Sequence, residues 1–225
     1  VGPLMPLFAL IFIVYMFTAD HFPGLLFARS ASISRAASML VYSTQGLYGA
    51  IWSVATTVII MFVIFGELLF MTPAGEFFIS LAMALFGHVR GGAAKVAVVA
   101  SSLFGTMSGS VVANIVTAGT FTIPMMKRMG YKPHVAAAVE AVSSTGGQIM
   151  PPVMGTSAFI MAEWLGIPYW SICVAGFIPA IFYYLGVFMM VDGEAERLGL
   201  RGLPRSECPS LRKTLKEGWT ALLPL

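Results

Sequence analysis

A long uncharged stretch of the chain covers residues 96–126, and it limits what the chain can fold into. A transmembrane helix needs about 20 apolar residues, so this stretch is too long for one crossing and too short for two. Arg90 and Lys95 precede it, and Lys127 and Arg128 follow it. Because short basic loops stay in the cytoplasm, both flanks are expected on the same side of a membrane. The stretch therefore predicts a re-entrant helical hairpin.

The composition is that of an integral membrane protein. Of the 225 residues, 58% are hydrophobic and 10% are charged, whereas soluble domains carry about 25% charged residues. The two cysteines, Cys173 and Cys208, indicate neither a disulfide framework nor a metal site. We expect an all-α protein without a cofactor. The chain does not begin with Met and closes on an apolar run at 219–225, so we expect an internal fragment of a longer protein.

Other apolar stretches predict further membrane helices. Residues 1–19, 48–71 and 169–191 are each long enough to cross. Residues 77–87 have helical spacing of apolar side chains but are too short to cross, which favours a helix lying in the interface. Residues 28–47 are mixed in character and predict a loop with a short amphipathic helix.

The distribution of charge gives a topology for the second half. Residues 135–163 would cross outward, and 169–191 would cross back to the cytoplasm. Residues 192–218 then emerge on the cytoplasmic side, as their basic residues require: Arg197, Arg201, Arg205, Arg212, Lys213 and Lys216. One conflict remains, since the same topology places Arg29 and Arg35 outside.

Two polar, glycine-rich interruptions break the apolar sequence, one at 105–110 and one at 145–152. Unpaired backbone at membrane depth is costly unless it lines a wet cavity or is buried in protein. Helix ends inside a membrane offer free N–H groups or carbonyls to ions. The interruptions therefore predict an ion or solute site. Side-chain oxygens would come from Thr106, Ser108, Ser110, Asn114 and Thr145. Flexible backbone would come from Gly105, Gly109, Gly146 and Gly147, and carbonyls freed from hydrogen bonding by Pro151 and Pro152. The alternative is that Gly and Ser merely allow close helix packing.

Two carboxylates lie on either side of the second interruption. Glu140 precedes it and Glu163 follows it. We expect both near helix ends, in the headgroup region or paired, and a role of Glu140 in the hinge stays open.

The residues in these interruptions resemble the large membrane subunit of tripartite ATP-independent periplasmic (TRAP) transporters. The similar segments are GTMSGSVVAN at 105–114, IPMMKRMGY at 123–131 and AAVEAVSSTGGQIMPPVMG at 137–155. The residues at 147–155 are similar to the variant in which small and large subunits are fused, which works with a TAXI-type solute-binding protein. The resemblance is strongest over residues 48–191.

The resemblance implies an elevator-type ion transporter fold, of which this chain would hold one inverted repeat. Residues 1–76 would be scaffold helices and 77–95 an arm helix with a basic loop. The re-entrant hairpin would occupy 96–126, and 127–191 would hold the transport-domain helices with the unwound segment. A cytoplasmic loop and the start of the next helix would follow at 192–225.

The resemblance also implies site residues. Ser108, Gly109, Ser110 and Asn114 would lie at the hairpin tip. The facing unwound segment would consist of Thr145, Gly146, Gly147, Pro151 and Pro152. Together they would contact a substrate carboxylate and coordinate Na⁺, with Ser108, Ser110, Thr145 and Gly146 as its ligands. The second half of the site is expected beyond Leu225.

The predicted function is Na⁺-coupled import of an organic anion through the bacterial inner membrane by a multi-pass permease. Its partners would be a periplasmic solute-binding protein of TAXI type and a small membrane subunit or its fused equivalent. An elevator-type anion symporter without a binding protein is one alternative. An intramembrane hydrolase using Ser108 or Ser110 is another, but no His lies in a membrane segment to serve as its base. The chain is therefore not expected to be an enzyme.

Overall fold

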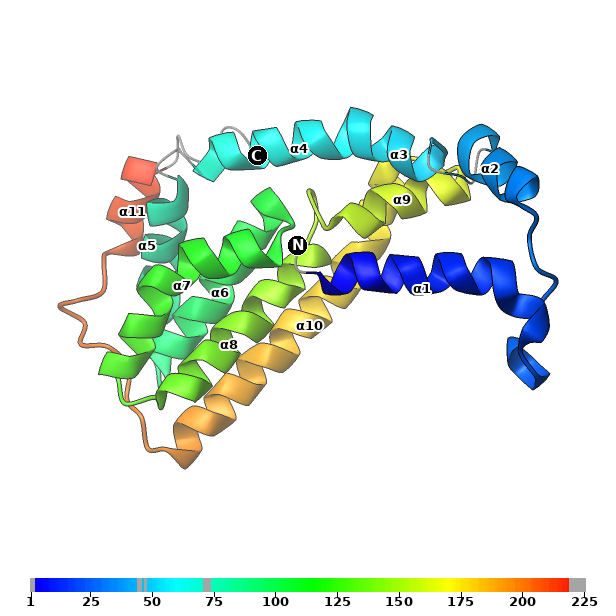
Figure 1. Ribbon diagram of the computed structural model, residues 1–225. Coiled ribbons are helices and arrows are strands. Elements are labelled where there is room, and N and C mark those ends of the chain that lie inside the picture. Colours follow the sequence, from blue (N-terminus) through cyan, green and yellow to red (C-terminus); the bar gives the residue numbers. More distant parts are fainter. Residues whose placement is uncertain (1–2, 44–45, 47, 71–73, 219–225) are drawn as a thin grey trace. The chain divides into compact units, whose positions relative to one another are not determined.

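The computed structural model describes residues 3–43, 46, 48–70 and 74–218 (Figure 1). Within these ranges the regular structure is helical, with no strand. The prediction of an all-α chain is confirmed. The apolar run at 219–225 lies outside the described residues. The chain divides into two compact units, residues 1–55 and 56–225.

The first unit consists of apolar helices with few contacts between them. Its α-helices are α1 (Leu4–Thr18), α2 (Ile33–Tyr42) and α3 (Ala50–Val54), and the short 3₁₀ turns η1 (Ala19–His21) and η2 (Gly24–Leu26) follow α1. Tyr15 holds the chain that follows α1, because its hydroxyl donates to Leu26 O at 2.7 Å. The Ser32 hydroxyl caps α2 by accepting from Arg35 N. The apolar side chains along α1 are largely exposed, as they are on a helix that faces lipid.

The second unit contains the remaining helical elements, long and short. They are η3, a π-turn (Ala55–Ile59), α4 (Ile60–Phe70), α5 (Ala74–Phe86), α6 (Gly92–Ser108), α7 (Val111–Arg128), α8 (Pro133–Thr145), η4 (Gly146–Gln148), α9 (Thr156–Leu165), α10 (Tyr169–Arg197) and α11 (Leu211–Gly218). Figure 1 shows α6, α7, α8 and α10 alongside one another. Both predicted interruptions are present, between α6 and α7 and between α8 and α9.

The first interruption arises from two capping residues. Gly109 ends α6 in the left-handed region at φ 57°, and its N–H donates to Gly105 O. The next residue, Ser110, is extended, and its hydroxyl caps α7 by accepting from Ala113 N at 3.4 Å. A glycine that ends one helix and a serine that begins the next reverse the chain within two residues.

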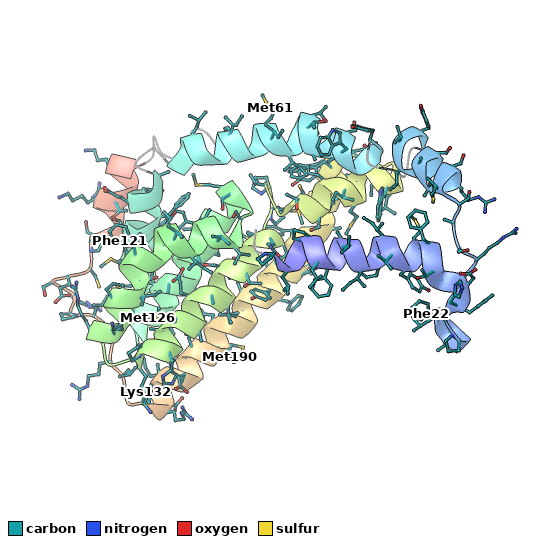
Figure 2. All side chains as sticks on the ribbon, viewed as in Figure 1. Phe22, Met61, Phe121, Met126, Lys132 and Met190 are labelled. Carbon is teal, nitrogen blue, oxygen red and sulfur yellow. The ribbon has the colours of Figure 1, made fainter. Side chains whose placement is uncertain are left out.

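Both basic flanks of the hairpin lie at the same end of the helices. One buried cluster joins Ala93 of α6 and Met126 of α7 with Tyr131 in the α7–α8 turn and Ala195 of α10. Figure 2 labels Met126 and Lys132 at this end. The start of α6, the end of α7, the start of α8 and the end of α10 therefore meet. A hairpin that enters and leaves on one side requires this arrangement.

An ion cluster ties the start of α6 to the end of α10. Asp192 accepts from Arg90 Nη2 and from Lys95 Nζ, each at 2.5 Å, and Arg90 also pairs with Glu196 at 3.2 Å. Lys95 is only 7% exposed. Hydrogen bonds from Arg90 and then Lys95 hold the pKa of Asp192, which lies beyond the apolar span, at about 2. Helix α10 continues through this cluster to Arg197, past the predicted end of the span at Val191.

Helix α10 meets the requirements for crossing a membrane. Among the described residues it is the one helix that is both long and apolar enough, with 29 residues. Met189 and Met190 are more than 70% exposed, and Figure 2 shows Met190 on the outer side of the helix. A helix is present where the sequence predicts one at 77–87: it is α5, which buries Phe77 and Phe78. The Phe78 and Phe104 rings pack edge to face at 5.7 Å, so α5 is anchored on α6.

We predict that Asp192→Asn lowers the melting temperature of the protein in detergent at neutral pH, because it leaves the nearly buried Lys95 ammonium without a counter-ion. The pKa of Asp192 is lowered, so its contribution is fully present above about pH 4, the ordinary carboxyl range. It is lost as the pH falls through about 2. Glu163→Gln, on the exposed surface of α9, is the control. Equal melting temperatures for the wild type and Asp192→Asn would contradict this assignment.

Candidate functional site

A cavity of about 320 Å³ opens at the tip of the hairpin. It lies where α6 ends, α7 begins and the second interruption passes. Its lining residues are Ile59, Ser108, Gly109, Ser110, Val111, Val112, Gln148, Val153, Met154, Gly155, Thr156 and Phe159. The structure thus brings together the two interruptions that the sequence separates by some 40 residues.

Backbone contact joins the hairpin tip to the second interruption. A Cβ atom built on Gly109 would overlap Met154 O, so only glycine fits there. Met154 itself has φ 56°, the left-handed conformation that non-glycine residues rarely adopt. The chain then returns, with Gly155 N donating to Gln148 O at 2.7 Å. The tip and the unwound segment consequently touch through main-chain atoms.

A second close approach lies one turn deeper in the hairpin. A Cβ on Gly105 would come within 2.6 Å of Gly147 Cα, and a Cβ on Gly147 would lie 3.0 Å from Gly105 Cα. These two glycines let α6 and η4 pack backbone to backbone. Both glycines belong to the predicted site residues. In the structure they allow close packing, which brings the backbone of the two interruptions together.

Asn114 presents an oxygen without a partner beside this contact. Its side chain is fully buried, and Nδ2 donates to Ser101 O at 2.9 Å. That bond fixes which way the carboxamide faces. Oδ1 then remains buried with no hydrogen-bond partner among the described residues. A buried amide oxygen without a donor is costly and is a natural ligand for a hard cation.

The serine hydroxyls of the tip are already engaged in shaping the turn. Ser108 Oγ accepts from Ser110 N at 3.3 Å, and Ser110 Oγ caps α7. Neither is hydrogen-bonded to a His, Asp or Glu in the described part of the chain. A nucleophile needs such a base, so the site lacks the arrangement of a hydrolase.

Two helices point their N-termini at the cavity. Val111 and Val112 open α7, and Thr156 opens α9, and all three line the cavity. Helix N-termini carry partial positive charge and free N–H groups, which favour an anion. Gln148 and Thr156 add polar side chains that the sequence analysis did not single out. Their position next to the second interruption is the signal that could have indicated them.

Of the nine site residues that the resemblance implies, Ser108, Gly109 and Ser110 line the cavity, Asn114 and Gly147 lie at the deeper glycine contact, and the other four lie at neither place. The Thr145 hydroxyl donates to Ala141 O within its own helix, at 2.8 Å. Gly146 packs against the rings of Tyr183 and Tyr184. Pro151 and Pro152 do not line the cavity, and Pro152 O accepts from Tyr169 Oη at 2.9 Å. Of the predicted Na⁺ ligands, Ser108 and Ser110 are at the tip, whereas Thr145 and Gly146 are not.

The expected position of Glu140 is wrong. It is fully buried and, among the residues that the structure describes, forms no ion pair; hydroxyls of Ser101, Thr122 and Ser144 contact its carboxyl group. The reason is that α8 turns one face toward α6 and α7, and Glu140 lies on that face with Ala136 and Ser143. The sequence feature that could have indicated this burial is the spacing of small residues three and four positions from Glu140, namely Ala136, Ser143 and Ser144.

The sequence matches, over residues 1–225, the family described as "Tripartite ATP-independent periplasmic transporter, DctM component". The sialic acid TRAP transporter large permease protein SiaM of Vibrio cholerae is 27% identical over 182 residues, 81% of this chain and 42% of that protein. The C4-dicarboxylate TRAP transporter large permease protein DctM of Pseudomonas aeruginosa is 31% identical over 155 residues, 68% of this chain and 35% of that protein.

A putative TRAP transporter large permease protein of Haemophilus influenzae is 27% identical over 165 residues, 73% of this chain and 38% of that protein. The chain therefore spans less than half the length of these relatives.

We predict that Gly105→Ala destabilises the contact between α6 and η4, because the new methyl group meets Gly147 backbone that cannot rotate away. Overpacking of this kind costs about 1–3 kcal/mol. Gly186→Ala is the matched control, since a Cβ there meets nothing within 4 Å. Thermal unfolding in detergent should show a lower melting temperature for Gly105→Ala and an unchanged or higher one for Gly186→Ala. Equal values for both variants would contradict the close approach.

Proposed function

Because the chain belongs to the DctM component family of tripartite ATP-independent periplasmic transporters, we propose that it forms part of a Na⁺-coupled permease importing an organic anion through the bacterial inner membrane. Relatives with a named substrate are named for sialic acid, C4-dicarboxylate and 2,3-diketo-L-gulonate. Each of these compounds is an organic acid. A carboxylate is accordingly the proposed substrate class.

The observation that carries the Na⁺ proposal is Asn114 Oδ1, which has no hydrogen-bond partner among the described residues. It is fully buried and fixed in orientation by the bond from Nδ2 to Ser101 O. It lies where Gly105 and Gly147 bring two interrupted helices into backbone contact. Interrupted helices supply carbonyl oxygens without burying a second charge. One amide oxygen with nearby backbone carbonyls is a ligand set suited to Na⁺.

The cavity at the tip supports the carboxylate. Its volume of about 320 Å³ is at the lower end of the range for small-molecule sites. The N-termini of α7 and α9 favour an anion there, and Ser108, Gln148 and Thr156 supply polar groups. The cation would then lie deeper and the anion nearer the opening.

We assign α6 and α7 to a re-entrant hairpin of an elevator-type transport domain. The shared position of both basic flanks supports this assignment, as does the break at Gly109. The segment α8–η4–α9 would be the broken crossing helix that faces the tip. In the same proposal residues 1–76 belong to the scaffold, and residues 77–95, which hold most of α5 and the basic loop, form the arm. Residues 192–225 would form the cytoplasmic loop and the start of the next helix.

A periplasmic solute-binding protein is the proposed partner, together with a small membrane subunit or a fused equivalent. The sequence GQIMPPVMG at 147–155 favours the TAXI type. An elevator-type symporter that needs no binding protein is the competing possibility. Uptake that appears only when the purified binding protein is added would support the first, and uptake without it would support the second.

We predict that Asn114→Ala raises the Na⁺ concentration for half-maximal uptake about tenfold, since a hydrogen bond or ligand to a charge is worth about 1.5–3 kcal/mol. The assay is uptake of a radiolabelled carboxylate into proteoliposomes of the complete permease with its binding protein. Thr120→Ala is the control, because that hydroxyl is exposed on the same helix and bonds only Thr117 O. Uptake by the wild type that is indifferent to Na⁺ would overturn the proposed coupling.

We predict that the cysteines introduced by His88→Cys and by Lys132→Cys both react with an impermeant maleimide from the cytoplasmic side of the membrane. Both positions are exposed and flank the hairpin. The measurement is labelling by an impermeant maleimide in inside-out and right-side-out vesicles, in a background of Cys208→Ser with the buried Cys173 retained. Labelling from opposite sides would show that 96–126 crosses the membrane and would remove the re-entrant hairpin.

A further inference from the structure

A carboxyl group lies at the centre of the interface of α6, α7 and α8. Glu140 is 0% exposed. Each helix contributes one hydroxyl: Ser101 Oγ lies 3.1 Å from Oε1, Thr122 Oγ1 lies 2.5 Å from Oε2, and Ser144 Oγ lies 3.2 Å from Oε1. Gly119 of α7 makes the space, since a Cβ there would be 3.2 Å from Glu140 Cγ. The carboxyl group is enclosed by the two hairpin helices, α6 and α7, and by α8, which carries it.

No positive charge neutralises this group. In the described part of the chain, Glu140 forms no ion pair with a Lys, Arg or His. Lys95, the nearly buried cation of α6, is paired with Asp192. The titratable group that faces Glu140 from α10 is Tyr184, whose hydroxyl donates to Ser143 O at 3.2 Å. A fully buried carboxylate without a counter-ion is strongly unfavourable, and such groups become neutral instead.

The two contacts of Thr122 fit a proton on the carboxyl group. Thr122 Oγ1 lies 3.0 Å from Ala118 O and 2.5 Å from Glu140 Oε2. A threonine hydroxyl has one hydrogen, and a backbone carbonyl can only accept. If Thr122 donates to Ala118 O, the hydrogen in the short contact must come from Oε2. A protonated Glu140 thus satisfies both contacts, whereas a carboxylate leaves one of them without a hydrogen.

The same distances are those of direct hydrogen bonds, not of oxygens on opposite sides of a metal ion. A cation of the size of Ca²⁺ or Na⁺ holds its oxygen ligands at about 2.3–2.6 Å, so that ligands on opposite sides lie ~5 Å apart. The oxygens around Glu140 are in direct hydrogen-bond contact, at 2.5–3.2 Å.

We propose that Glu140, held by Ser101, Thr122 and Ser144, is a proton-binding site of this permease, separate from the cation site at Asn114. The two sites share Ser101. Its Oγ donates to Glu140 Oε1, and its carbonyl oxygen accepts from Asn114 Nδ2. Ionisation of Glu140 places an uncompensated charge between the hairpin helices and disturbs the bond that orients Asn114. Proton binding at Glu140 therefore keeps the hairpin packed and the Asn114 amide in place.

Infrared spectroscopy of the complete permease in lipid nanodiscs tests proton binding without any transport. The wild type at neutral pH should show the carbonyl stretch of a protonated carboxylic acid, shifted when H₂O is replaced by D₂O. Glu140→Gln should lack this band, and Glu163→Gln, exposed on α9, should keep it. Absence of the band in the wild type, or its persistence in Glu140→Gln, would overturn the proposal.

A second variant covers the case in which Glu140→Gln does not fold. Thr122→Val removes the partner of Oε2 and keeps the volume of the side chain, so the carboxylic acid band should move to higher frequency while remaining present. A band at the wild-type frequency would overturn the assigned hydrogen bond.

The effect on transport rests on the proposed function and has its own readout. At constant Na⁺, wild-type uptake into proteoliposomes should fall toward alkaline pH as Glu140 loses its proton. Glu140→Gln should keep a flat profile and retain its Na⁺ dependence. A flat wild-type profile would overturn the link between this proton and transport. Uptake indifferent to Na⁺ at every pH would count against the proposed function, and the infrared band would still decide whether Glu140 binds a proton.

Discussion

Main-chain contact between the two interruptions is the constraint on which the rest of the second unit depends. Gly109 lies against Met154 O, and Gly105 lies against Gly147 Cα. A side chain larger than hydrogen at either hairpin position would separate α6 from the second interruption. Because the contacts are made by backbone, polar main-chain groups from two interrupted helices gather at one place without any buried charge. The cavity at the tip and the free oxygen of Asn114 both exist because of this approach.

The opposite end of the hairpin is held by charge. Arg90 and Lys95 meet Asp192, which joins the start of α6 to the end of α10. The hairpin is thus fixed by ion pairs where its basic flanks lie and by glycine packing at its tip. This division follows the environment, since ion pairs are tolerable near water and neutral backbone contacts are tolerable in an apolar surrounding.

The sequence predicted the positions of the helix breaks and the composition of the tip, because Gly109 and Ser110 are local capping signals that need no tertiary context. It did not predict which oxygens converge. Thr145 bonds Ala141 O within its own helix, and Glu140 points into the core. Those outcomes depend on how α8 is rotated against α6 and α7. A rotation of one residue moves a side chain by about 100°, and periodicity in an apolar helix with small residues on several faces does not determine it.

The placement of Glu140 gives a role to one buried hydroxyl residue on each of α6, α7 and α8. Ser101, Thr122 and Ser144 each present a hydroxyl to one carboxyl group, while Gly119 leaves it space. An apolar residue in place of Glu140 would leave these hydroxyls facing one another, whereas a carboxylate would bring an unpaired charge into the core. A carboxylic acid is the state that fits all of them, since it has both a hydrogen to give and oxygens to accept. The same core that packs the hairpin is therefore sensitive to a single proton, and Ser101 transmits that state to Asn114.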